Sequence, residues 1–223
     1  ELGVNSRRTL FRMVGGPEYT DPRPFLWADK DVETRFTYVL DVPDDTEALL
    51  DSFSRDLRRE IRKGNELDLA VSVENEEAAE RVARDVVSRY EEQGETAPFT
   101  VEYVRDLVDA LDDHARTYVI RDDEGDYLGG IIALYSNDRA YFWQGGVGRN
   151  YEGISTNSLL HWRVIRDISN GSPIESVDEY DLVGANTERL CEYKAKFGAD
   201  LVPYYVAESN GTGMALAKKA YQL

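Results

Sequence analysis

A glycine-rich stretch between a predicted strand and a predicted helix is the part of the sequence best suited to hold a phosphate. Residues 141–157 read YFWQGGVGRNYEGISTN. Free amides at a helix start carry partial positive charge, and glycines let the backbone approach an anion closely. The sequence therefore predicts a phosphate or pyrophosphate site formed by Gln144, Gly145, Gly146, Val147, Gly148, Ser155 and Asn157. The alternative is a tight turn in which Ser155 or Thr156 caps the helix.

Four basic residues fall within six positions, at Arg58, Arg59, Arg62 and Lys63. At the end of a helix they can make charge-assisted contacts with phosphate groups. The same segment carries Asp51, Asp56 and Glu60 at distances that allow surface ion pairs, and cations also favour a helix C-terminus. Substrate binding and a solvated, ion-paired helix end both stay open.

The remaining titratable residues suggest one base and no metal site. Asp181 or Glu179, near the end of a predicted strand, can act as a general base toward an amine. His114, His161 and the single cysteine, Cys191, lack the spacing of metal ligands, so no bound metal is predicted. His161 lies within a predicted helix, where we expect it to be packed rather than catalytic.

Alternating strand and helix patterns supply the elements that must position these residues. Apolar residues recur at spacings of three and four from Thr46, which predicts one helix that stops at Gly64. Three strands in quick succession, an antiparallel meander, are predicted at 116–122, 127–136 and 140–147. Helix, strand, helix and strand then follow at 155–169, 180–183, 187–197 and 199–208. The predicted fold class is α+β, a mixed sheet with an antiparallel meander flanked by helices.

Three motifs occur in this order along the chain: RREIRK at residues 58–63, NSLLHW at 157–162 and KAKFG at 194–198. Together with the order of the elements, they resemble the acyl-transferring half of the GNAT fold and, within that superfamily, the FemAB-like branch of peptidoglycan-bridge aminoacyltransferases. The resemblance covers residues 37–207. It implies a GNAT-like acyltransferase domain over 37–223, preceded in residues 1–36 by the tail of a similar half or by an N-terminal extension.

The resemblance also implies catalytic roles. Tyr193, seven residues after Asn186, corresponds to a tyrosine that protonates the leaving group, and Lys194 to a lysine that stabilises charge on the donor phosphate or in the transition state. Asp181 completes the predicted catalytic set as the base. A tyrosine at the edge of the core and a solvated lysine remain the alternatives for Tyr193 and Lys194.

The resemblance further implies a donor that is not tightly bound. FemAB-like enzymes typically take an aminoacyl-tRNA as donor and an amine as acceptor. Coenzyme A-dependent GNAT enzymes instead carry an Arg/Gln-x-x-Gly-x-Gly/Ala loop, and the QGGVG at residues 144–148 departs from that spacing. We therefore expect no tightly bound cofactor and an aminoacyl-tRNA donor, with acetyl-CoA as the alternative.

The composition is strongly acidic. The chain has 43 acidic and 26 basic residues, six of them lysines and 20 arginines, which gives a net charge of −17. General coating of nucleic acid is excluded by this charge, and the 42% hydrophobic and 11% aromatic content excludes a disordered acidic tail. The pattern predicts an acidic surface and a halophilic source, since molar salt, with a Debye length of about 3 Å, screens the self-repulsion.

A single cysteine cannot form a disulfide within the chain, so the sequence does not require an oxidising compartment. No apolar run approaches the roughly 18 residues of a membrane span. A cytoplasmic chain without a membrane span is predicted. Its function is predicted to be acyl or aminoacyl transfer that forms an amide directly from an activated acyl donor and an amine acceptor. The alternatives are an acetyl-CoA-dependent N-acetyltransferase and a catalytically silent GNAT-like binding module. The sequence favours no particular oligomeric state.

Overall fold

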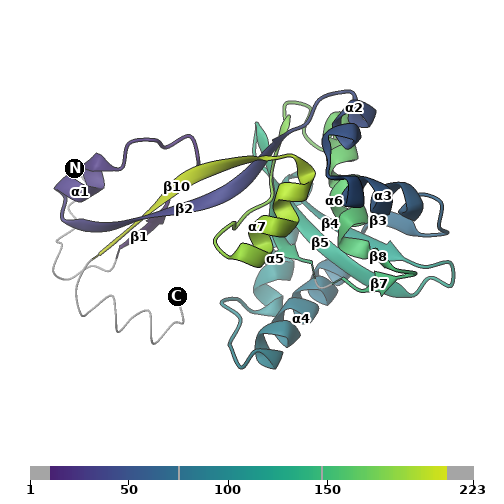
Figure 1. Ribbon diagram of the computed structural model, residues 1–223. Coiled ribbons are helices and arrows are strands. Elements are labelled where there is room, and N and C mark those ends of the chain that lie inside the picture. Colours follow the sequence, from purple (N-terminus) through teal and green to yellow (C-terminus); the bar gives the residue numbers. More distant parts are fainter. Residues whose placement is uncertain (1–10, 75, 147, 210–223) are drawn as a thin grey trace.

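A computed structural model describes residues 11–74, 76–146 and 148–209 of the chain (Figure 1). Its helices are α1 (Arg23–Trp27), α2 (Thr46–Ser52), α3 (Arg55–Gly64), α4 (Glu76–Glu92), α5 (Val101–Leu111), α6 (Thr156–Ser169) and α7 (Glu188–Lys194), with 3₁₀ turns η1 (Asp112–His114) and η2 (Ala195–Phe197). Its strands are β1 (Arg12–Val14), β2 (Lys30–Asp41), β3 (Ala70–Glu74), β4 (Ala115–Arg121), β5 (Tyr127–Tyr135), β6 (Arg139–Gly145), β7 (Asn150–Tyr151), β8 (Ile154–Ser155), β9 (Glu179–Asp181) and β10 (Asp200–Ser209). Within these residues no helix has both the length and the apolar character needed to cross a bilayer.

A single large sheet organises the described residues. Its eight strands lie in the order β1-β10-β2-β9-β6-β5-β4-β3, and β6 with β9 is the parallel pair among antiparallel ones. Two separate apolar clusters show that helices cover both faces. One cluster joins α2, α3 and α6 to the sheet, and the other joins α4 and α5 to it. The predicted α+β class is confirmed, and so is the antiparallel meander of β4, β5 and β6.

The predicted single helix from Thr46 to Gly64 is wrong, because the chain breaks after Ser52 into α2 and α3. Phe53 adopts an extended backbone and turns its ring into the core, where it meets Trp162 and Phe197 edge-on. Ser54 then starts the second helix, since its hydroxyl accepts a hydrogen bond from Leu57 N at 3.3 Å. A capping residue in the middle of an apolar periodicity was the signal for the break.

A two-stranded ribbon extends from the sheet (Figure 1). β10 pairs with β2 along ten residues of each strand, Asp200 with Val39 through Ser209 with Lys30. β9 meets the opposite edge of β2 at Val39, Leu40 and Asp41 only. The rest of β2 therefore leaves the sheet with β10, and β1 joins the outer part of the ribbon. The strand runs across residue 36, and the division of the chain at that position stays a prediction.

β6 and β9 run side by side briefly and then separate. They pair in parallel from Arg139 with Glu179 to Tyr141 with Asp181. Beyond this point β6 stays with β5 as far as Gly145. The chain after β9 follows β2 instead, since Leu182 N donates to Tyr38 O at 2.8 Å. An opening between the two strands follows from these different partners.

Phe197, in η2, is a core residue that links the helix layer to this opening. Its ring is fully buried and contacts Phe53, His161 and Tyr193 edge-on. We expect Phe197→Ala to lower the free energy of unfolding by about 3–5 kcal/mol, because it removes a large buried ring and leaves a cavity. Leu201→Ala on β10, at a side chain 51% exposed, should cost less than about 1 kcal/mol. Denaturant titration measures both, and equal losses would contradict this assignment of the core.

Candidate functional site

Lys194, the last residue of α7, is buried at the end of β9 and is 4% exposed. Its ammonium donates to the carbonyl oxygens of Val183 and Gly184, the latter at 2.8 Å. It also lies 5.9 Å from the ring centre of Phe142, the first residue of β6 beyond the paired stretch. The lysine therefore spans the opening between the separating strands. The alternative of a solvated lysine is excluded by this burial.

Burial lowers the pKa of Lys194 to about 8, because desolvation disfavours the charged amine, while the nearby Asp181 acts in the opposite direction. The pKa of Asp181 is itself raised, chiefly by its own desolvation. This carboxylate is 5% exposed. It accepts hydrogen bonds from the Thr37 hydroxyl and from Val183 N, the latter at 2.7 Å, both through Oδ1. Asp181 thus holds the turn at Val183, besides acting on the charge of Lys194. Its role as a base stays a prediction.

The turn that these two residues hold is strained. Val183 has φ +46, in the left-handed region where β-branched residues are rarely found. Its N–H is bound by Asp181 and its carbonyl by Lys194, so the turn is fixed from both sides. Such strain persists only where the surroundings enforce it, and it is typical of functional sites.

Tyr193, the residue before Lys194 on α7, contacts His161 of α6 with its ring, and the polar groups near its hydroxyl are Ser158 and Glu60. The hydroxyl is buried without a partner of good hydrogen-bond geometry. The pKa of this phenol is raised mainly by desolvation; the nearby Ser158 hydroxyl lowers it, and Glu60 raises it. The hydroxyl therefore stays protonated at neutral pH, as a proton donor must.

His161 on α6 packs behind Tyr193, with ring centres 6.1 Å apart. It is 2% exposed, and its Nδ1 lies 2.8 Å from the Tyr180 hydroxyl. Burial lowers the pKa of His161 to about 3, and the charge of Lys194 lowers it further. The expectation of a packed histidine is confirmed by its burial.

The glycine-rich loop continues from β6 onto the start of α6. Gly145 has φ +114, and a Cβ atom there would lie 2.4 Å from Gly130 O, so other residues are excluded. Gly148 lies so close to α6 that a Cβ would meet Asn157 Oδ1 and Thr156 Oγ1 at 2.4 Å. Val147 lies outside the described residues. The loop is therefore folded tightly onto the helix.

Side chains of the first turn of α6 hold this loop in place. Asn157 Nδ2 donates to Gly146 O at 2.8 Å, and Asn157 Oδ1 is buried without a partner. Gly146 N already donates to Gly130 O at 3.3 Å. Ser155 is the N-cap residue but makes no side-chain cap, and the Thr156 amide donates to Arg149 O at 3.2 Å instead. Gln144 is half-buried on β6, opposite Ile132 of β5.

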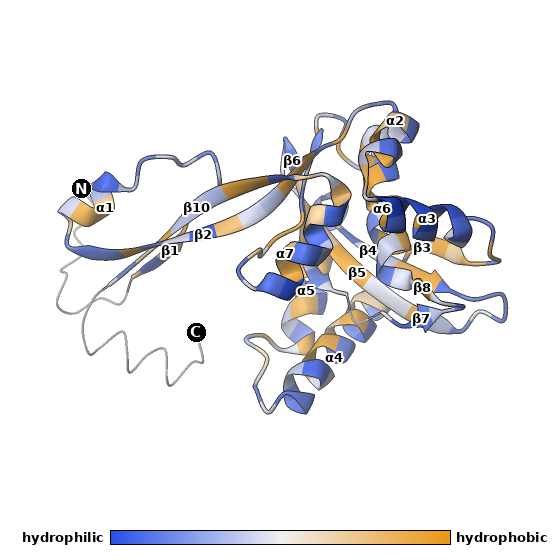
Figure 2. Ribbon diagram, viewed as in Figure 1, coloured by the Kyte–Doolittle hydropathy of each residue, from blue (hydrophilic) through white to orange (hydrophobic). Residues whose placement is uncertain are grey.

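The four predicted substrate-binding residues lie on α3 and line one surface pocket together with Arg55 and Glu66. Three of them form ion pairs: Arg58 and Arg62 with Asp51, at 3.7 and 3.0 Å, and Arg59 with Asp56 at 3.6 Å. Lys63 Nζ donates to Glu152 O at 2.8 Å. In Figure 2, α3 is blue along most of its length. These are the ion pairs that the alternative interpretation predicted.

The structure brings most of the predicted residues into one neighbourhood. α3 adjoins the start of α6, since Ser158 Oγ donates to Glu60 Oε2 at 2.9 Å. His161 in turn links α6 to Tyr193. Sequence reasoning missed Thr37, Phe142 and the strained Val183. No local pattern marks them, because each acquires its role through a partner that is distant in sequence.

Comparisons with known proteins agree with this geometry. The profile of the acetyltransferase (GNAT) domain family matches residues 51–195. No curated protein sequence matches the chain. Among solved structures, FemX is similar with a TM-score of 0.61 at 14% identity, over 77% of this chain and 61% of FemX. The chain thus spans less than two thirds of the length of FemX.

Two further solved structures are similar in fold. The C-terminal domain of a protein named as a lysylphosphatidylglycerol synthetase, from Agrobacterium fabrum, has a TM-score of 0.56 at 16% identity, over 88% of this chain and 67% of that one. L-PGS from Bacillus licheniformis also has a TM-score of 0.56, at 12% identity, over 89% of this chain and 68% of that one. At these identities the likeness is one of fold.

The buried ammonium of Lys194 gives stability a specific pH dependence. Between pH 8 and the ordinary lysine pKa of 10.5, the unfolded chain holds a proton that the folded chain has released. The free energy of unfolding therefore rises with pH across this window. We expect the difference in the free energy of unfolding between the native chain and Lys194→Met to grow by about 1–3 kcal/mol between pH 8 and 10.5.

Denaturant titrations at several pH values measure this difference. Lys196→Met, at an exposed side chain two residues further on, is the matched control, and its difference from the native chain should stay flat. A flat difference for Lys194→Met as well would contradict a buried charge at this position.

Proposed function

Because the chain belongs to the acetyltransferase (GNAT) domain family, a family of acyltransferases, we propose that it transfers an acyl or aminoacyl group from an activated donor to an amine and so forms an amide. The observation that carries this proposal is the adjacent pair Tyr193 and Lys194 on α7, of which Lys194 lies at the opening between β6 and β9. The pair offers a buried phenol hydroxyl and a buried ammonium that is held by two carbonyl oxygens.

The proposed reaction begins with a neutral amine attacking the acyl carbonyl. An N–C bond forms, and negative charge develops on the carbonyl oxygen. Alternate backbone amides of β6 point away from β5, and beyond Tyr141 they face the opening, where they can donate to this oxygen. Lys194 has three N–H donors and two carbonyl partners, so the third can add to this stabilisation.

Proton transfers complete the proposed reaction. Asp181, whose raised pKa brings it closer to the working range of a base, takes the proton that the amine loses. The bond from the acyl carbon to the leaving sulfur or oxygen then breaks, and Tyr193 gives its proton to that atom. Tyr193 can supply this proton because a phenol is protonated at neutral pH.

We propose an aminoacyl-tRNA as the donor, in the FemAB-like manner. Support comes from the basic pocket on α3, next to the start of α6, and from a fold similar to FemX and to a protein named as a lysylphosphatidylglycerol synthetase. One observation favours acetyl-CoA as a second candidate. The glycine-rich loop leads into the N-terminus of α6, which has no side-chain cap, and a helix start of this kind favours a pyrophosphate, although the Thr156 amide itself donates to Arg149 O.

Tyr193→Phe tests the role of the phenol without endangering the fold. Because the hydroxyl is buried and unpartnered, its loss should leave the free energy of unfolding unchanged or slightly higher. We expect kcat for acyl transfer to fall by about 10²–10⁴-fold, as for the loss of a general acid. Tyr103→Phe, at a side chain 54% exposed on α5, is the control and should keep full activity. Unchanged kcat in Tyr193→Phe would remove the general acid from the proposal.

Thermal-shift titration with acetyl-CoA, free CoA and an aminoacyl-tRNA mixture tests the donor. A ligand at 100 times its Kd stabilises the fold by about 2.7 kcal/mol. We expect a shift with aminoacyl-tRNA at the lowest KCl concentration that preserves the fold, and a smaller shift for Arg59→Gln/Arg62→Gln, since lost cations weaken phosphate binding. Arg81→Gln/Arg84→Gln on α4 removes two charges from the opposite face of the sheet and should leave the shift intact.

A shift with acetyl-CoA alone would contradict the tRNA donor and support the second candidate. No shift with any donor, together with no acyl transfer, would contradict an enzyme and leave a binding module.

A further inference from the structure

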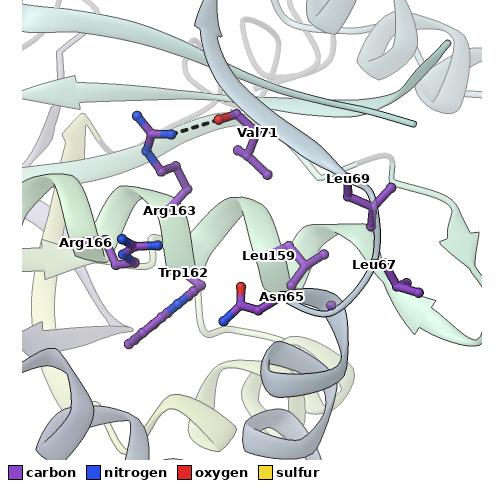
Figure 3. A pocket seen from close by; sticks show the side chains of 9 residues that line it. Asn65, Leu67, Leu69, Val71, Leu159, Trp162, Arg163 and Arg166 are labelled. Atoms are coloured by element: carbon purple, nitrogen blue, oxygen red, sulfur yellow. Dashed lines mark hydrogen bonds between the residues drawn. The ribbon is translucent and has the colours of Figure 1, made fainter. Parts of the chain in front are cut away.

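A pocket of about 200 Å³ lies on the side of α6 that faces α3 and β3 (Figure 3). Leu159, Trp162, Arg163 and Arg166 line it from α6. The segment that joins α3 to β3 closes the other side. Asn157 and His161, which face the candidate site, project from a different side of the same helix. The pocket is therefore distinct from the opening between β6 and β9.

The pocket combines an apolar wall with positive charge. The wall consists of Leu67, Leu69 and Val71, all half-buried, with Leu159 and Trp162 behind them. Figure 3 shows Leu67 and Leu69 on the segment opposite α6 and both arginines on α6 itself. None of the nine lining residues is acidic. A half-buried apolar wall beside a cation fits a ligand that has an apolar body and an anionic group.

The two arginines differ in what they contact. Arg163 is committed to the protein, since its Nε donates to Asp167 at 2.8 Å and its Nη1 to Val71 O at 2.8 Å. The exposed guanidinium of Arg166 has no hydrogen bond or ion pair with the described residues. Its planar fork matches a carboxylate in two parallel hydrogen bonds.

We propose that this pocket binds a small monocarboxylate whose body is a single aromatic ring or a branched alkyl chain. The carboxylate pairs with Arg166, and the body lies against Leu67, Leu69 and Trp162. Size sets the class, because a cavity of about 150 Å³ accommodates benzene, so 200 Å³ leaves little room beyond one ring and its short linker. This site is independent of the proposed acyl transfer.

Titration of the ¹⁵N-labelled chain with 3-phenylpropionate tests the proposal by NMR. We expect saturable shift changes at residues 64–71 and 159–166, with a Kd in about the millimolar range. The neutral 3-phenylpropanamide should bind at least about tenfold more weakly, because a charge-assisted pair contributes more than a neutral one. Arg166→Gln should weaken the binding of 3-phenylpropionate by a similar factor, and Arg166→Lys should weaken it less.

Arg84→Gln, which removes an exposed charge from α4, should leave the affinity unchanged. Arg166 is exposed, so its replacement should not disturb the fold, which the spectrum itself reports. Equal affinity of the native chain and Arg166→Gln would overturn the proposal. Saturable shifts at residues 142–146 and 193–194 in place of the pocket, or no saturable shifts at all, would overturn it too.

Discussion

The candidate site depends on a conflict between hydrogen-bond partners. β6 and β9 can pair only while each also satisfies its other neighbour, and after three residues these neighbours diverge. β5 holds β6 through Gly145, where only a glycine fits against the Gly130 carbonyl. β2 holds the chain beyond β9 through Tyr38 and Phe36. An opening in the middle of a sheet thus arises from strand pairing alone.

Lys194 is what makes this opening stable. Burying an ammonium is costly, and the structure offsets the cost with two carbonyl partners and with the nearby carboxylate of Asp181. The same contacts hold Val183 in its strained conformation, so they fix the position of Lys194 and of the chain that follows β9. A lysine is adapted to this place because three donors on one nitrogen can serve converging carbonyls, whereas the planar fork of an arginine cannot.

The sequence predicted the elements better than their breaks, and motifs better than contacts. Periodicity located α6, and short apolar runs separated by turn sequences located the meander. The same periodicity concealed the break at Phe53, since a buried ring keeps the apolar spacing whether or not the helix continues. The motif at 194–198 directed attention to Lys194, but not to the carbonyls it binds, since those depend on a strained turn that periodicity does not report.

Composition and site geometry together limit how an anionic donor can be recognised. If the chain works in molar salt, as its arginine-rich and acidic composition predicts, a Debye length of about 3 Å abolishes long-range attraction. The basic face of α3 then acts only through direct contact, and its arginines must leave Asp51 and Asp56 to make it. Buried groups are screened much less, so the effect of Lys194 depends less on salt than that of the exposed arginines. Under the proposed function, discrimination between donors therefore rests on the opening between β6 and β9, and the exposed arginines of α3 contribute weaker contacts.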